Sequence, residues 1–87
     1  MTESEERADE AHRRSLEAHR RAEATHREAA DLHERAAAFY TEHAQIDREA
    51  GQAERAEERE RQAEHERDLA AKERAHSDEN ARPPDNG

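Results

Sequence analysis

The sequence has few of the residues from which a compact protein core is built. Among 87 residues there is no cysteine and no tryptophan, and there is one phenylalanine, one tyrosine and one methionine. Without cysteine the chain forms neither a disulfide framework nor a thiolate metal site, and it offers no thiol nucleophile. The apolar fraction is 30%, and 19 of these residues are alanine. A compact globular core is therefore excluded, and with it an enclosed catalytic pocket.

Long apolar runs are missing as well. No window approaches the roughly 18 apolar residues of a transmembrane helix, and residues 1–14 are acidic and polar where a signal peptide would be basic and then apolar. We therefore expect a cytoplasmic protein without membrane insertion. The net charge of -9 opposes unspecific binding to nucleic acid. Residues 11–27 are locally basic, but they lack lysine and aromatic residues, so we do not expect a nucleic-acid partner.

Proline and glycine, which interrupt helices, are almost missing too. Between residues 2 and 80 there is no proline and a single glycine, Gly51. The remaining composition is rich in alanine, glutamate, arginine and glutamine, which have high helix propensity. This composition predicts an all-α protein with one long helix over about residues 3–79.

Both ends of this helix carry sequence signals. The segment Thr-Glu-Ser-Glu at residues 2–5 has the spacing of a capping box, in which the threonine hydroxyl accepts from the amide three residues later. At the other end, Pro83 forces the preceding residue out of helical geometry. We therefore expect a disordered tail over residues 81–87.

A heptad repeat organises the first half of the chain. The segment Glu-Ala-His-Arg-Arg at residues 10–14 recurs unchanged at residues 17–21. With Ala11 at heptad position d, 14 consecutive a and d positions hold no carboxylate, lysine or arginine, although 45% of the chain is charged. This stripe is typical of a coiled coil with a thin, alanine-rich seam. The predicted helix-pairing seam, called the a/d stripe below, consists of Ala8, Ala11, Ser15, Ala18, Ala22, Thr25, Ala29, Leu32, Ala36, Phe39, His43, Ile46, Ala50 and Ala53.

The second half of the chain does not continue this stripe, because the next positions in the same register are glutamates. The sequence thus predicts an alanine-rich coiled-coil helix over residues 3–53 and a highly charged, solvated helix over residues 54–80. A single line of alanines at seven-residue spacing remains there: Ala56, Ala63 and Ala70.

Gly51 lies close to the boundary between the two segments. A glycine within a helix costs about 1 kcal/mol relative to alanine, which is consistent with a slight bend in one continuous helix. A hairpin is the alternative, but no Ser, Thr, Asp or Asn follows as the N-cap of a second helix. We therefore favour the bend over the hairpin.

The residues beside the a/d stripe indicate how two such helices would pair. In a parallel homodimer the flanking contacts are neutral or repulsive, as between Glu49 and Glu54. In an antiparallel homodimer, a register in which paired residue numbers add to 61 sets small residues against large ones, as for Ala22 and Phe39. The same register brings oppositely charged g residues together. We therefore predict an antiparallel coiled-coil homodimer.

Seven histidines are the other unusual feature of the composition. Four of them occupy heptad position e, beside the stripe, and are candidates for a pH response: His12, His19, His26 and His33. Histidine changes charge near pH 6.5. In the antiparallel register His12 approaches Glu54 and His19 approaches Asp47, so acidification would favour association, whereas a protonated His43 within the seam would oppose it. The alternative is a polar flank that the repeat merely duplicated.

The histidines do not have the spacing of a metal site. Seven residues span about 10.5 Å of helix, so the four candidates cannot chelate one ion within a chain. Residues 23–26 and 73–76 have the Glu-x-x-His spacing of carboxylate-bridged metal bundles, but further buried carboxylates are missing. We expect no metal site and no cofactor.

No nucleophile with a partner base and no glycine-rich phosphate loop occurs in the sequence, so we do not expect an enzyme. We expect a small coiled-coil module for self-association or for binding an unknown protein partner, responsive to pH through the histidine stripe. The alternative is a largely disordered, hydrophilic stress-type protein or a histidine-rich metal buffer.

Overall fold

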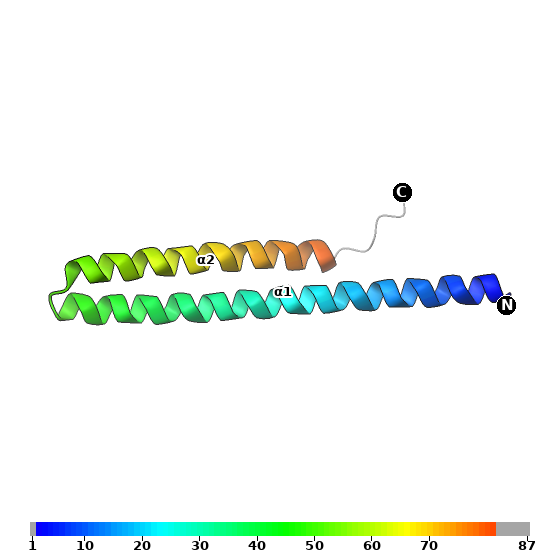
Figure 1. Ribbon diagram of the computed structural model, residues 1–87, viewed down its shortest axis with the longest axis horizontal. Coiled ribbons are helices and arrows are strands. Elements are labelled where there is room, and N and C mark those ends of the chain that lie inside the picture. The colour runs from blue at the N-terminus through cyan, green and yellow to red at the C-terminus, as the bar shows by residue number, and fades with distance from the viewer. Residues whose placement is uncertain (1, 82–87) are drawn as a thin grey trace.

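The computed structural model is an antiparallel helical hairpin (Figure 1). Helix α1 spans Glu3–Glu49, helix α2 spans Ala53–Ala81, and the two lie side by side in an elongated molecule. The structure describes residues 2–81, and within this range it contains no strand. The all-α prediction is confirmed. The prediction of one long helix over residues 3–79 is wrong, because the chain reverses direction after α1.

Gly51 makes this reversal. Its φ of +75° lies in the left-handed region, which glycine adopts at little cost because it has no Cβ. The amide of Gly51 donates to the carbonyl of Arg48 at 3.1 Å, and the amide of Gln52 donates to the carbonyl of Asp47 at 2.7 Å. These two bonds form a Schellman motif, which satisfies the last carbonyls of α1. The slight bend favoured at Gly51 is therefore wrong, and the hairpin is the observed structure.

The second helix begins without a capping side chain. Its first helical hydrogen bond runs from the amide of Ala56 to the backbone carbonyl of Gln52. A missing N-cap costs about 1 kcal/mol. The hairpin forms despite this cost, with Ala56, Ala63 and Ala70 of α2 buried. The absence of a capping residue was therefore not sufficient to exclude a second helix.

Alanines at seven-residue spacing form the contact between the helices. Each of the six buried alanines is at most 3% exposed: Ala30, Ala37 and Ala44 in α1, and Ala56, Ala63 and Ala70 in α2. The register follows from polar contacts, since His33 bonds Glu66 and the Ser77 hydroxyl donates to the carbonyl of Glu23. Residues whose numbers add to about 100 are therefore level with each other. The small side chains allow the two helices to approach closely.

The face of α1 that packs on α2 is not the a/d stripe. The buried alanines of α1 occupy heptad position b, one residue after position a. His26 and His33, which bridge the helices, occupy position e, one residue after position d. One residue corresponds to a rotation of about 100° around the helix axis. Helix α2 therefore packs beside the a/d stripe and leaves most of it uncovered.

The ends of the helices agree in part with the sequence signals. The Thr2 hydroxyl accepts from the amide of Glu5 at 3.3 Å, which confirms the predicted helix start. Helix α2 continues through Ala81, and the remainder of the predicted tail lies outside the described residues. Because Ala81 is level with residue 19 in this register, residues 3–18 of α1 extend beyond α2 (Figure 1).

Candidate interaction surface

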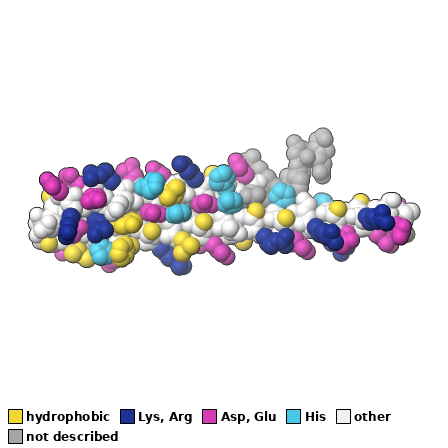
Figure 2. All heavy atoms as spheres, viewed as in Figure 1, with side chains coloured by type: hydrophobic (Ala, Val, Ile, Leu, Met, Phe, Trp, Pro, Cys, Tyr) yellow, Lys and Arg dark blue, Asp and Glu magenta, His cyan; other side chains and the backbone are white. Residues whose placement is uncertain are grey.

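The three largest apolar side chains of the a/d stripe lie on the surface of the hairpin. Leu32 is 63% exposed, Phe39 is 52% exposed and Ile46 is 54% exposed. Their seven-residue spacing places them in one line along α1. Figure 2 shows hydrophobic side chains gathered along this side of the hairpin, toward the turn.

The other members of the stripe flank this line. Four a positions are half-buried at the edge where α2 packs: Ala22, Ala29, Ala36 and His43. The other seven residues are exposed: Ala8, Ala11, Ser15, Ala18, Thr25, Ala50 and Ala53. Up to the turn, the predicted seam is thus one continuous surface of α1, and α2 covers only its a edge.

Aromatic contacts hold the centre of this surface in place. The ring centroid of Phe39 lies 4.1 Å from that of His43 and 5.8 Å from that of Tyr40, the latter in an edge-to-face arrangement. Both Tyr40 and His43 are half-buried. Phe39 is therefore supported from two sides while half of its side chain faces solvent, which is favourable for contact with another molecule.

Two of the four candidate pH-responsive histidines bridge the helices. Nδ1 of His26 lies 2.5 Å from Oε2 of Glu73, and Nδ1 of His33 lies 2.5 Å from Oε2 of Glu66. All four side chains are less than one-third exposed. A protonated imidazole would donate a charge-assisted hydrogen bond to each carboxylate. These pairs form one edge of the hairpin, the edge next to the a/d stripe.

The other two candidates lie elsewhere. His12 is exposed and His19 is half-buried, at or beyond the end of α2. The structure therefore divides the histidine stripe into a pair that joins the helices and a pair on the extension of α1.

The carboxyl of Glu73 responds to its histidine neighbours. The hydrogen bond from His26 lowers the pKa of Glu73, the positive charges of His26, His76 and His33 act in the same direction, and partial burial opposes them. The ring of His76 lies 5.2 Å from that of His26. Glu73 thus prefers its ionised form in the hairpin.

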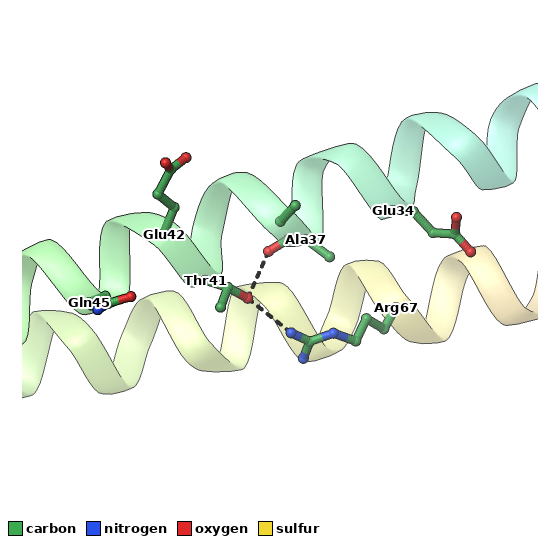
Figure 3. A pocket seen from close by; sticks show the side chains of 7 residues that line it. Glu34, Ala37, Thr41, Glu42, Gln45 and Arg67 are labelled. Carbon is green, nitrogen blue, oxygen red and sulfur yellow. Dashed lines mark hydrogen bonds between the residues drawn. The ribbon is translucent and has the colours of Figure 1, made fainter.

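The other edge of the hairpin carries arginine contacts, again at seven-residue spacing. They join Arg74 to Glu34, Arg67 to Thr41 and Arg48 to Glu60. Glu34 and then Asp31 raise the pKa of the Arg74 guanidinium. Figure 3 shows that the Thr41 hydroxyl, which accepts from Arg67, also donates to the carbonyl of Ala37.

The far flank of the a/d stripe, at the g positions, is charged and exposed. Within the described residues, four of its side chains take part in no ion pair: Glu28, Arg35, Glu42 and Glu49. Arg14 and Arg21 of the same flank pair only within α1, with Glu10 and Glu17. The hairpin therefore uses the charges on its two inner edges and leaves this flank available.

Sequence patterns alone did not single out Glu66 and Glu73 as partners of the histidines. Their seven-residue spacing matches that of His26 and His33, so a signal was present. It becomes interpretable only when the chain is known to fold back, because the paired residues are 33 and 47 positions apart.

Other site types find no support within residues 2–81. No group of three or more His, Asp and Glu side chains there is arranged to hold a metal ion. Neither described helix has a stretch of sufficient length and apolarity to span a bilayer. No protein-family model, curated protein or solved structure matches the chain. A functional proposal therefore depends on the surface of the hairpin.

Proposed function

We propose that the chain is a non-enzymatic protein-interaction module whose working surface is the a/d stripe of α1. The observation that carries this proposal is an inverted distribution of apolar side chains. Within residues 2–79 the six buried apolar positions are all alanine, whereas Leu32, Phe39 and Ile46 are each more than half exposed. The hairpin therefore buries alanines and leaves these three large side chains on its surface, where another molecule can contact them.

The free energy available at this surface is substantial for a chain of this size. Complete burial of a Leu, Ile or Phe side chain contributes about 1.5–3 kcal/mol. Because about half of each side chain is exposed, covering Leu32, Phe39 and Ile46 would add roughly 2–5 kcal/mol. Their alignment along one helix suits a partner helix whose axis lies along α1.

The groove between Thr41 and Arg67 supports a non-enzymatic role. The groove in Figure 3 contains one hydroxyl group, that of Thr41, which lies next to Arg67. This hydroxyl donates to the carbonyl of Ala37 and accepts from Arg67. Its proton is therefore held by the backbone and not by a base, which is the opposite of an activated nucleophile. No observation favours the disordered or metal-buffering alternatives.

Site-specific photo-crosslinking in cells tests the proposal. A p-benzoylphenylalanine residue replaces Phe39 on the stripe, and Asp68, exposed on α2, is replaced in a matched control. We expect defined protein adducts from position 39, either of this chain or of another protein, and none from position 68. If position 39 yields no adduct, or the same adducts as position 68, the stripe is not an interaction surface.

A further inference from the structure

We infer that the occupant of the a/d stripe is a second copy of this chain, with the two α1 helices antiparallel. This inference rests on the proposed function and names the partner. In the register that we assign, paired residue numbers across the two chains add to 61. The two-fold axis then lies between Ala30 and Asp31, near the middle of the long α1 helix.

The distribution of side-chain size along the stripe fits pairing with itself. The N-terminal half of the stripe is small, with alanine, serine and threonine, and the C-terminal half holds Leu32, Phe39 and Ile46. A two-fold interface must be self-complementary. Antiparallel pairing sets Ser15 against the partner's Ile46 and Ala22 against the partner's Phe39. Each large side chain thereby meets a small one, which fills space without overpacking.

The hairpin leaves room for this partner. The stripe is rotated by about 100° from the face that packs on α2, because one set of positions follows the other by one residue. In a four-helix arrangement each helix contacts two neighbours, on faces that are separated by about this angle around the helix axis. A second α1 can therefore pack on the stripe while α2 stays in place.

The extension of α1 beyond α2 gives a second reason. Residues 3–18 have no α2 beside them (Figure 1). In the assigned register residues 12–18 lie along residues 43–49 of the partner's α1, and residues 3–11 reach past the partner's turn. Ala18 then faces the partner's His43, and Ala11 faces the partner's Ala50. The dimer therefore covers residues 12–18, the part of this extension that lies next to α2.

Charge complementarity supports the same register. The g positions bring together Arg14 with the partner's Glu49, Arg21 with the partner's Glu42, and Glu28 with the partner's Arg35. Each pair joins opposite charges, and the four side chains Glu28, Arg35, Glu42 and Glu49 have no ion pair within the described part of the chain. Such exposed pairs determine orientation more than affinity.

Sedimentation equilibrium of the full chain tests the inference. We expect a monomer–dimer equilibrium in the wild type. The double substitution Phe39→Glu and Ile46→Glu, at positions that are more than half exposed in the hairpin, should weaken the dimer at least 100-fold with unchanged helicity by circular dichroism. A wild type that remains monomeric at millimolar concentration overturns the inference.

Charge reversal tests the register. Glu42→Arg with Glu49→Arg should weaken the dimer roughly tenfold, since each altered pair contributes well under 1 kcal/mol and symmetry doubles the number of pairs. Adding Arg14→Glu and Arg21→Glu should restore it. The matched control, Glu57→Arg with Glu64→Arg on the exposed face of α2, should not change it. Equal weakening by the control, or no restoration, overturns the assigned register.

The two proposals fail in distinguishable ways. If position 39 crosslinks to a different protein in cells and the purified chain is monomeric, the interaction module stands and the second copy is wrong as its partner. If position 39 gives no crosslink and the chain is monomeric, both proposals are wrong.

Discussion

Replacement of Gly51 by alanine distinguishes the hairpin from a continuous helix by the sign of its effect. In the hairpin, Gly51 has φ +75°, and a Cβ at this position would meet no atom within 4 Å. The cost of Gly51→Ala is therefore the left-handed conformation alone, about 1–2 kcal/mol. In a continuous helix the same substitution would stabilise by about 1 kcal/mol. The two structures thus differ by about 2–3 kcal/mol in the predicted effect.

Thermal unfolding followed by circular dichroism measures this sign. At a fixed protein concentration, 1 kcal/mol corresponds to roughly 4–8 °C for a domain of this size, so Gly51→Ala should lower Tm by several degrees. Gly51→Asn is the matched control, because asparagine tolerates the left-handed region better than alanine. The hairpin predicts the stability order Gly, Asn, Ala. An alanine variant more stable than the wild type would refute the turn described for Gly51.

Two further predictions concern the contact between the helices. Ala63 is 1% exposed, so the contact between the helices has no room for a larger side chain there. Ala63→Leu should therefore destabilise the hairpin by about 1–3 kcal/mol relative to the exposed control Ala71→Leu. Equal Tm values for the two variants would contradict the alanine contact. The lowered pKa of Glu73 means that its stabilising contribution is present above the unfolded pKa and is lost as pH falls through the folded pKa. Tm should therefore decrease on acidification below about pH 5, and less so in Glu73→Gln than in the exposed control Glu64→Gln; identical acid profiles would contradict the pairing with His26.

Local signals in the sequence were sufficient for the helical class and for the start of α1, but not for the division into two helices. Helix propensity and the capping threonine at residue 2 predicted an all-helical chain and the start of α1, because these depend on neighbouring residues. The turn at Gly51 was missed because its favourable energy comes from distant residues. A Schellman motif needs only glycine at the right place, and the packing that selects it lies tens of residues away.

The heptad pattern of α1 contains two helix faces, the a/d stripe and the face that packs on α2, and sequence reasoning recognised only the first. The a/d stripe attracted attention because it holds the large apolar residues, whereas the contact face of the hairpin consists of alanines, with Glu23 and Ser77 at its far end. Alanine is common throughout this chain, so a line such as Ala30, Ala37 and Ala44 has little contrast in the sequence. The alanine line of α2 was recognised in the sequence, and it consists of Ala56, Ala63 and Ala70. The line of α1 on which it packs was not recognised.

Electron–electron distance measurements on singly spin-labelled chains test the central claim, that α1 presents its a/d stripe to an antiparallel second copy. The chain has no cysteine, so Glu10→Cys and Ala24→Cys each introduce one label, at exposed c positions that face away from both contact faces. The assigned register predicts label separations along the helix axis of about 60 Å for position 10 and about 20 Å for position 24. Equal short distances at both positions would show a parallel dimer, and the absence of any intermolecular distance would show that the stripe does not bind a second copy.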